Sequence, residues 1–122
     1  LISSSILADF VKLPDVLPDS EPNWFALPIM LKKEVEYLRN DLVTYLKSNG
    51  VETRPIVAGN LARHPVRRRF PEVFGGHFPG ADEIHSRGYY TGLHPFDMTN
   101  EIHRYAILLT KYFEKRSNPD GA

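Results

Sequence analysis

The amino-acid sequence predicts an α+β fold: a small two-layer domain in which helices cover one side of a sheet of about three strands. Its 122 residues are enough for one domain with a single core. A nearly continuous apolar run over residues 24–31 is typical of a buried strand. Apolar residues spaced three and four apart over residues 38–50 and 97–116 indicate amphipathic helices. Shorter strand candidates lie at residues 51–57 and 89–93, so strands and helices alternate along the chain.

The composition narrows the possible classes of function. Equal numbers of basic and acidic residues give a formal net charge of zero, so the chain lacks the general positive charge that attracts nucleic acid or an anionic membrane. The absence of cysteine excludes disulfides, thiol catalysis and cysteine-bound metal, and it favours a cytoplasmic protein. No apolar run reaches the roughly 20 residues of a membrane-spanning helix. The first residues also lack the basic start and the cleavage site of a signal peptide.

Three segments are expected along the chain. Apolar positions at helical spacing in residues 1–12 predict the end of a linking helix, followed by a proline-rich connector up to residue 20. Residues 21–116 are predicted to form the small domain, and residues 117–122 a frayed tail. Because the sequence does not begin with Met, we expect it to be a piece of a longer protein.

Local signals define the elements of the small domain. Pro28 interrupts the first predicted strand and, because proline has no amide donor, indicates a sheet edge or a bulge there. Gly50 is placed to end the helix that follows. The segment from residue 58 to residue 80 is expected to be a long loop, and residues 81–88 a short helix. Thr99 is placed to cap the last helix.

A charged pair interrupts the strand predicted at residues 51–57. Because side chains alternate along a strand, Glu52, Arg54 and Ile56 share one face, and Thr53 lies on the other. Neighbours on a face are roughly 7 Å apart, and this spacing alone favours an ion pair at the sheet edge. The alternative is that both side chains hold one polar ligand, with arginine donating to phosphate or sugar oxygens and glutamate accepting from hydroxyls.

Polar and basic residues continue beyond this strand. Glycine at position 59 permits a sharp turn close to a ligand, and Asn60 offers both a donor and an acceptor, although an ordinary turn is the simpler interpretation of Gly59 and Asn60. The basic run Arg63–Arg69 has no aromatic residues within it and no recognisable reading helix. A solvated loop is therefore favoured over a nucleic-acid site, and a surface for a phosphorylated small molecule is the second interpretation.

The histidines give little sign of metal or nucleophile chemistry. No two of the five have the spacing, with an adjacent acid, that zinc hydrolases show, so no metal site is expected. His85 is expected on a helix surface or at a helix cap. His94 lies in a loop bounded by glycine and proline, where functional residues concentrate. Nucleophile, phosphate-binding and dinucleotide-binding motifs are absent, so no catalytic residue is assigned within the chain.

Several segments taken together resemble a known family. The strand and turn Gly50–Asn60, the helix start Ala81–Ile84, the strand Gly88–His94 and the pair Trp24–Phe25 follow its pattern. They resemble the C-terminal region of the pyridoxal-phosphate-dependent nucleotide-sugar aminotransferases and dehydratases, the DegT/DnrJ/EryC1/StrS family. The likeness covers roughly residues 20–115. It is greatest to the sugar 3-dehydratase branch, which includes GDP-4-keto-6-deoxymannose 3-dehydratase and CDP-4-keto-6-deoxyglucose 3-dehydratase.

The resemblance implies the C-terminal domain of a fold-type-I enzyme that uses pyridoxal or pyridoxamine 5′-phosphate. In the family, a lysine in the aminotransferases or a histidine in the dehydratases works on the cofactor, in a segment that this chain does not match. The chain alone is therefore expected neither to bind the cofactor nor to turn over substrate. At the matching positions, the resemblance makes Glu52 and Arg54 contacts of the nucleotide-sugar, with Gly59 and Asn60 in the turn that follows.

The resemblance also implies that His94 lies near the substrate-binding site. This residue matches a loop position near the substrate, although Leu93 stands before it where the family often has asparagine. The substrate-binding residues expected from the resemblance are Glu52, Arg54, Gly59, Asn60 and His94.

Two functions remain open at this point. The first is the substrate-side domain of a 3-dehydratase or aminotransferase in deoxysugar and lipopolysaccharide O-antigen biosynthesis. It implies a GDP- or CDP-4-keto-6-deoxyhexose substrate, a cytoplasmic location and a homodimeric full-length protein. The second is a free-standing module that binds a sugar nucleotide or a protein through the basic loop. Neither implies a nucleic-acid or membrane partner.

Overall fold

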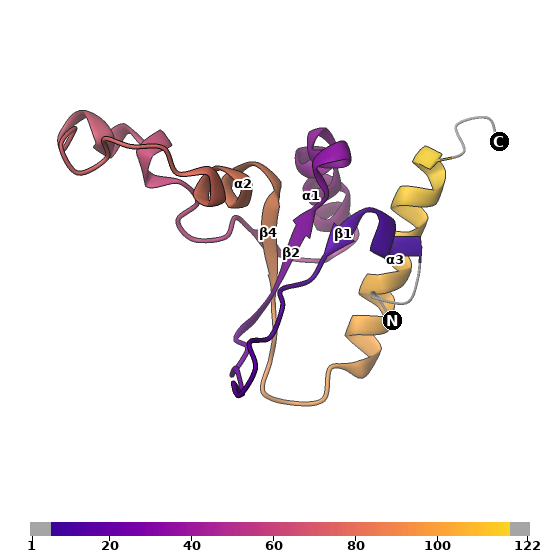
Figure 1. Cartoon of the computed structure of the whole chain (residues 1–122). Coiled ribbons are helices and arrows are strands. Elements are labelled where there is room, and N and C mark those ends of the chain that lie inside the picture. The colour runs from indigo at the N-terminus through magenta and orange to yellow at the C-terminus, as the bar shows by residue number, and fades with distance from the viewer. Residues whose placement is uncertain (1–5, 118–122) are drawn as a thin grey trace.

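A computed structural model describes residues 6–117 and has the α+β architecture that the sequence predicts. Within these residues, four strands form one antiparallel sheet in the order β1-β2-β4-β3. Figure 1 labels the first three of these, β1, β2 and β4. The central strands are β2 (Ala26–Leu31) and β4 (Gly88–Gly92), and the outer strands are β1 (Val11–Lys12) and β3 (Thr53–Arg54). The described sheet thus has one strand more than the sequence indicates.

The two central strands direct alternate side chains to the core and to the opposite face. Ile29 of β2 and Tyr89 of β4 are paired across the ladder, and both are completely buried. Their neighbours Pro28 and Tyr90, also paired, belong to the opposite face and are half-buried. Tyr90 lines the candidate site described below.

Pro28 occupies a position where β2 needs no amide donor. The amide of Leu93 donates to the carbonyl oxygen of Phe25 at 3.2 Å, so alternate residues of β2 from Phe25 onward direct their backbone groups toward β4. Pro28 falls between them, and its nitrogen faces the β1 side. The described part of β1 pairs further along, with Met30 and Leu31. At Pro28, β2 is therefore an edge strand locally, in agreement with the prediction.

Strand β1 lies where the sequence predicts the end of a helix. Residues Ile6–Asp9 form a short 3-10 helix, and Val11 and Lys12 then pair with β2. Leu7 and Val11, which contribute to the helical spacing, are both buried against the core. The pairing with β2 outweighs the helical periodicity in this segment, and the first part of the predicted helix, residues 1–5, lies outside the described residues.

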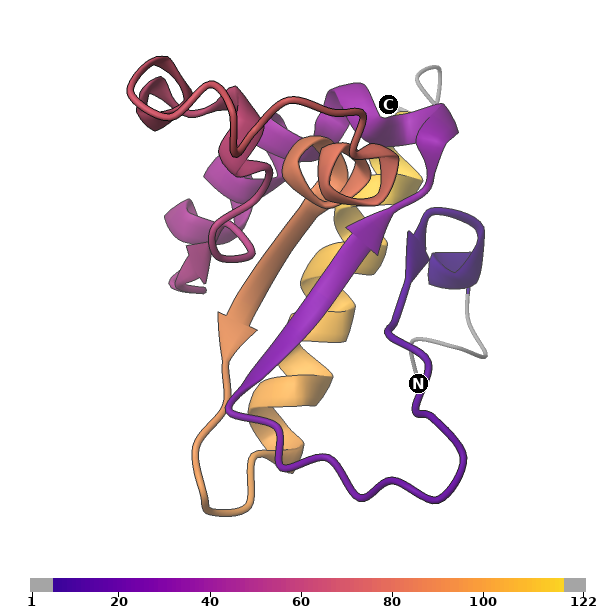
Figure 2. The same cartoon turned by 60° about the vertical axis from the view of Figure 1, so that its left-hand side comes forward.

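Helices α1 (Arg39–Ser48) and α3 (Thr99–Ser117) lie on one face of the sheet (Figure 2). Their apolar sides meet the inward side chains of β2 and β4 in a common core. Aromatic rings contribute much of it, and Phe10 stacks on Phe113 with ring centroids 4.5 Å apart. The largest completely buried residues are Leu7, Ile29, Leu31, Leu42, Leu46, Tyr89, Leu109, Tyr112 and Phe113.

Helix α1 ends at the predicted glycine. Gly50 has a φ of 78°, a left-handed conformation that glycine adopts without steric cost. Its amide donates to the carbonyl oxygen of Lys47 at 3.0 Å, and the amide of Val51 donates to that of Leu46 at 3.0 Å. These two bonds form a Schellman motif, which satisfies the last carbonyls of the helix and directs the chain into β3.

Helix α3 begins at Thr99, but Asp97 supplies the capping side chain. Oδ1 of Asp97 accepts hydrogen bonds from the backbone amide of Thr99 at 2.9 Å and from its hydroxyl at 2.6 Å. The prediction that Thr99 caps the helix is therefore wrong. A carboxylate two residues earlier reaches the free amide first, as in an Asx turn.

Helix α2 (Pro79–Arg87) lies on the other face of the sheet, at one end of it (Figure 2). Residues 61–78, which we call the arm, precede α2 and project away from the sheet (Figure 1). The arm contains the short 3-10 helices Leu61–Arg63 and Pro65–Arg68. It corresponds to the long loop that the sequence predicts, and it separates β3 from the helix that closes the candidate site.

Candidate functional site

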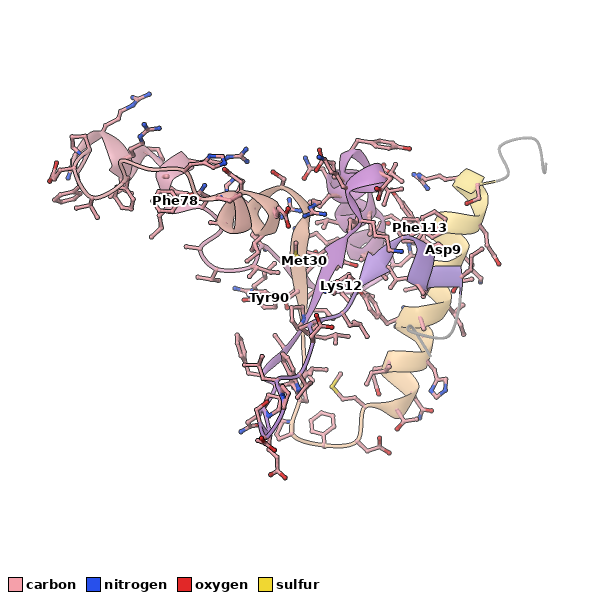
Figure 3. All side chains as sticks on the ribbon, in the orientation of Figure 1. Asp9, Lys12, Met30, Phe78, Tyr90 and Phe113 are labelled. Atoms are coloured by element: carbon pink, nitrogen blue, oxygen red, sulfur yellow. The ribbon has the colours of Figure 1, made fainter. Side chains whose placement is uncertain are left out.

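A cavity of about 810 Å³ lies beside β3, at the edge of the sheet, among β3, β4, α2 and residues Arg39 and Lys47 of α1. Tyr90 lines this cavity and lies on the opposite side of the sheet from Phe113 of α3 (Figure 3). Three predicted site residues, Glu52, Arg54 and Gly59, line the cavity. The other polar or titratable residues of its wall are Arg39, Lys47, Thr53, His64, His85 and Tyr90.

Glu52 and Arg54 form the ion pair that their spacing favours. Nε and Nη2 of Arg54 donate to Oε1 of Glu52 at 3.0 and 2.7 Å. Both side chains are exposed, whereas Thr53 between them is buried, which agrees with the predicted alternation. The hydrogen bond to Glu52 raises the pKa of Arg54, so the guanidinium stays charged. Because exposed ion pairs contribute little to folding, both side chains can exchange this contact for a ligand.

The backbone beneath the charged pair is fixed by the neighbouring strand. Arg54 pairs with Tyr90 in the β3–β4 ladder, and the hydroxyl of Thr91 donates to the carbonyl oxygen of Glu52 at 2.9 Å. Strand β3 ends at Arg54, earlier than the predicted boundary, where Pro55 follows and offers no amide for the ladder. The short β3 therefore presents the charged pair at the edge of the sheet.

Gly59 adopts the sharp turn predicted for it, and the group that approaches it is His85. Gly59 has a φ of 65°, and a Cβ at this position would lie 2.5 Å from Nδ1 of His85. The imidazole is half-buried in the cavity wall instead of lying on an outer helix surface or at a cap. Sequence reasoning missed His85 because its partners lie on a turn far away along the chain, and no local motif marks them.

Asn60 lies behind the cavity wall and connects the turn to α2. Its side chain is buried, donates through Nδ2 to Oδ1 of Asp82 at 2.9 Å and accepts through Oδ1 from the amide of Ala62 at 2.9 Å. The backbone amide of Asn60 donates to Nδ1 of His85 at 3.2 Å. The Asn60 side chain could contact a ligand only by giving up one of these hydrogen bonds. In this structure, Asn60 therefore connects the turn to α2 and stabilises the cavity wall.

The surroundings of His85 disfavour its charged form. Burial of the ring lowers the pKa of His85, and the positive charges of Arg63, His64 and Arg39 lower it further, while Asp82 acts in the opposite direction. Arg63 is itself paired with Asp82, with Nε and Oδ1 2.8 Å apart. The imidazole in the wall is therefore neutral at physiological pH.

His94 lies in a separate hollow of about 350 Å³ between the end of β4 and the start of α3. Its ring stacks on Phe96 with centroids 5.1 Å apart, and its backbone amide donates to the sulfur of Met98 at 3.0 Å. Glu52 lines both this hollow and the larger cavity. The structure thus brings Glu52, Arg54 and Gly59 together with Asn60 behind them, and it places His94 apart.

Neither a metal-binding group nor a membrane-spanning helix is found within residues 6–117. Among them, no group of three histidine, aspartate or glutamate side chains is arranged to hold a metal ion. No helix in this part of the chain combines the length and the apolar character needed to span a membrane.

Comparison with known proteins establishes the relationship that the motifs suggest. Residues 3–107 match the DegT/DnrJ/EryC1/StrS aminotransferase family. The chain belongs to this family. The match includes every candidate site residue, from Glu52 to His94, and it confirms the resemblance drawn from the sequence motifs.

Three curated relatives are between 26% and 32% identical to this chain over the aligned residues. The chain is 31% identical over 99 residues to lipopolysaccharide biosynthesis protein RfbH of Salmonella typhimurium, an alignment that covers 81% of this chain and 22% of the relative. It is 32% identical over 92 residues to GDP-4-keto-6-deoxy-D-mannose 3-dehydratase of Yersinia pseudotuberculosis, covering 75% and 23%. A dTDP-4-dehydro-2,6-dideoxy-D-glucose 3-dehydratase of Saccharopolyspora spinosa is 26% identical over 106 residues, covering 87% and 23%.

About a quarter of the length of several solved structures has the same fold as this chain. GDP-4-keto-6-deoxymannose-3-dehydratase, in a mutant form with bound GDP-perosamine, matches with a TM-score of 0.70 and 25% identity over 82% of this chain and 26% of that one. The Escherichia coli enzyme with bound hydrated PLP matches with a TM-score of 0.68 and 24% identity, covering 82% and 25%. The chain therefore spans about a quarter of the length of the relatives that it matches.

Proposed function

We propose that this chain is the substrate-side C-terminal domain of a nucleotide-sugar 3-dehydratase that depends on pyridoxal or pyridoxamine 5′-phosphate. The observation that carries the proposal is the open cavity with Glu52 and Arg54 in its wall, in a chain whose relatives include 3-dehydratases of nucleotide-linked sugars. The whole protein would act in deoxysugar and lipopolysaccharide O-antigen biosynthesis, as the name of the Salmonella relative suggests for that protein.

The charged pair has the chemistry that such a substrate needs. A nucleotide-sugar combines an anionic diphosphate with a sugar rich in hydroxyls. Arg54 offers a permanently charged donor for phosphate or sugar oxygens, and Glu52 offers an acceptor for hydroxyls. Both are held on the edge strand beside Tyr90 and are exposed to solvent, so a substrate can replace their mutual bond without unfolding the domain.

The described residues do not fit a pyridoxal phosphate site of their own. All six lysines are exposed on the surface: Lys12, Lys32, Lys33, Lys47, Lys111 and Lys115. A lysine that forms a Schiff base, the arrangement of the aminotransferases, is usually desolvated so that its amine loses its proton at neutral pH. In the dehydratases, the histidine that takes its place lies in a segment that this chain does not match. We therefore assign the cofactor to segments outside this chain, and the role of these residues is to bind and orient the substrate beside it.

The reaction type and the nucleotide base are part of the same proposal. We favour dehydration over transamination, because relatives named for their reactions are 3-dehydratases. We favour a GDP-linked 4-keto-6-deoxyhexose, because two relatives above 30% identity are named for that substrate class. A CDP-linked sugar remains the second choice. Mass spectrometry of products from GDP-, CDP- and dTDP-linked sugars distinguishes loss of the C3 oxygen from replacement of the ketone oxygen by an amine.

The test of the proposal is the variant Arg54→Ala in the full-length protein. Because the change removes a charge-assisted hydrogen bond to the substrate, kcat/KM should fall by about tenfold or more. Lys111→Ala is the matched control: Lys111 is exposed on α3 and lies outside the cavity wall, so its variant should keep wild-type kcat/KM. Unchanged turnover and KM in Arg54→Ala would remove this residue from the substrate site.

A second candidate function follows from the openness of the cavity. Glu52 and Arg54 are exposed to solvent even without the rest of a longer protein. The chain by itself could therefore bind a sugar nucleotide, and a free-standing sugar-nucleotide module is the alternative. Calorimetric titration of the 122-residue chain with GDP- and CDP-sugars separates the two proposals. Tight binding by this chain supports the module. Absence of binding, combined with turnover by the full-length protein, supports the enzyme domain.

Two further features belong to the enzyme proposal. We propose a homodimer for the full-length protein, and the exposed apolar side chains of the arm support an interface there: Leu61, Val66, Phe70, Val73 and Phe78. We propose a cytoplasmic location, which the lack of cysteine supports because reducing compartments do not select for disulfides.

A further inference from the structure

His85 is the one histidine of the larger cavity that is fixed by a bond to the backbone of another element. Its Nδ1 lies 3.2 Å from the backbone amide of Asn60, and its ring packs so closely on Gly59 that the turn has no room for a Cβ. His64 meets the same ring edge-to-face, with centroids 6.0 Å apart. Two residues of a left-handed turn thus hold one imidazole in the wall of the cavity.

The bond from Asn60 determines where the imidazole carries its proton. A backbone amide can only donate, so Nδ1 of His85 must accept and cannot carry hydrogen. In a neutral imidazole the single ring proton is then on Nε2. Burial and the neighbouring charges of Arg63, His64 and Arg39 hold the pKa of His85 below its usual value, so the neutral form is the populated one. His85 is therefore a fixed single donor.

The electrostatic balance of the cavity favours an anionic acceptor for this donor. Arg39, Lys47 and Arg54 contribute three positive charges to the wall, and Glu52 contributes one negative charge that Arg54 already neutralises in part. Arg39 donates through Nε and Nη2 to the carbonyl oxygen of Gly88 at 3.2 and 3.1 Å, which fixes its charge close to the cavity. A neutral N–H donor in positive surroundings matches a phosphate oxygen better than a hydroxyl.

We propose that His85 is a substrate-binding residue whose Nε2–H donates to a diphosphate oxygen of the nucleotide-sugar, in the cavity that His85 lines together with Glu52 and Arg54. This inference rests on the proposed function of the cavity. It also gives Gly59 and Asn60 a role through His85: they orient the donor, and the side chain of Asn60 itself need not reach the ligand. The turn after β3 then contributes to substrate binding through the imidazole that it holds.

Two substitutions test the Nε2–H donor and the Nδ1 acceptor of His85 separately. His85→Asn keeps an oxygen acceptor near the place of Nδ1 for the Asn60 amide, but it removes the donor at Nε2. His85→Gln keeps an amide N–H near the place of Nε2 and loses the acceptor. The matched control is His103→Asn, because His103 is exposed on α3 and bonds through Nδ1 to the carbonyl oxygen of Thr99.

The experiment titrates the full-length variants with GDP-mannose and with GDP, which share the diphosphate. We expect His85→Asn to weaken both ligands by roughly tenfold, the loss that one hydrogen bond to a charged acceptor gives. His85→Gln should recover most of that affinity, and His103→Asn should bind as the wild type does. Wild-type affinity in a folded His85→Asn protein would overturn the proposal. Loss of affinity for GDP-mannose alone would overturn the diphosphate assignment.

A measurement on the wild type keeps the proposal testable if His85→Asn fails to fold. In protein labelled with 15N-histidine, one imidazole should show an unprotonated Nδ1 and a protonated Nε2, and its Nε2 signal should move when GDP is added. A His85 that is protonated on Nδ1, or whose Nε2 signal does not respond to GDP, would contradict the proposal.

Comparing Arg54→Ala with His85→Asn distinguishes failure of the inference about His85 from failure of the cavity as the substrate site. If Arg54→Ala weakens GDP-mannose binding and His85→Asn does not, the inference about His85 fails while the proposed function stands. If neither variant changes the affinity of a full-length protein that does bind GDP-mannose, the assignment of this cavity as the substrate site fails.

Discussion

At the scale of single residues, the turn after β3 depends on contacts that only glycine allows. Gly59 combines a left-handed φ of 65° with the close approach of the His85 ring. A non-glycine residue pays roughly 1–2 kcal/mol for the backbone conformation alone, and a methyl group here would also displace the imidazole. Both costs act on the same wall of the cavity.

Gly59→Ala should therefore destabilise the domain by at least this backbone cost of about 1–2 kcal/mol. Urea unfolding of the purified protein measures the change in the free energy of unfolding. Gly80→Ala is the matched control, because a Cβ at Gly80 of α2 would have no atom within 4 Å. Replacing a helical glycine with alanine should leave stability unchanged or raise it by up to about 1 kcal/mol. Equal stability of Gly59→Ala and wild type would contradict the close packing of His85.

Residue-scale prediction from the sequence succeeded where the signal is local. The spacing of Glu52 and Arg54 is enough to predict their ion pair, because alternation along a strand depends on backbone geometry alone. The contact between Asn60 and His85 joins residues 25 positions apart, across the arm. Its formation depends on how α2 returns to the sheet, which is a property of the tertiary fold and has no counterpart in a local pattern.

At the scale of elements, the first turn of α3 illustrates how a side chain outside the helix fixes its start. The carboxylate of Asp97 accepts two hydrogen bonds from Thr99, one from its hydroxyl and one from its amide. These bonds lower the pKa of Asp97 below its ordinary value of 3.8. The folded state therefore binds fewer protons at this site than the unfolded state does, and the contribution of Asp97 to stability is present above about pH 4 and is lost as the pH falls through the depressed pKa.

Asp97→Ala should consequently lower the thermal midpoint at neutral pH, and the difference from wild type should shrink in acid, well below pH 3.8. Asp97→Asn is the control, since its amide oxygen still accepts from Thr99 and does not titrate in this range. Differential scanning calorimetry at several pH values measures all three proteins. A constant difference between wild type and Asp97→Ala across this range would show that the carboxylate is not the stabilising form.

Elements with a strong periodic pattern were the ones that the sequence predicted well. Helices α1 and α3 follow from apolar stripes and from Gly50, and the β2 and β4 strands from apolar or aromatic runs. Strand β1 was missed because two residues are too few to show alternation, and Leu7 and Val11 mimic helical spacing. The pairing of β1 with β2 and the burial of Val11 stabilise β1, and both depend on long-range contacts.

At the scale of the whole molecule, the fold class was predictable and the placement of the arm was not. Alternating strands and helices imply two layers, and α1 and α3 form the expected layer on one face. Helix α2 and the arm lie on the other side of the sheet (Figure 2), where Ile84 and His85 of α2 and His64 of the arm contribute to the cavity wall. The arm mixes basic with apolar residues and contains only short 3-10 helices, so no long periodic stripe indicates which face these segments cover.

The arm exposes several large apolar side chains to solvent. Phe70 is 48% exposed, and four further apolar side chains of the arm are exposed with it: Leu61, Val66, Val73 and Phe78. Several exposed apolar side chains in one segment are typical of contacts between proteins. Because homo-oligomers are usually symmetric, one surface that fits a second copy of the protein gives a closed dimer. We therefore expect the arm to be part of the proposed homodimer interface.

Phe70→Glu in the full-length protein should shift the assembly from two copies toward one, because a charge at this position would have to be buried without a partner in the dimer. Light scattering during size-exclusion chromatography measures the molar mass of each variant across a dilution series. Phe96→Glu is the control, since Phe96 is 65% exposed on a different loop, before α3, and its variant should keep the wild-type mass. A dimeric Phe70→Glu together with a monomeric Phe96→Glu would place the interface at the opposite end of the sheet. In that case, the apolar side chains of the arm would have to be covered by another part of the same protein.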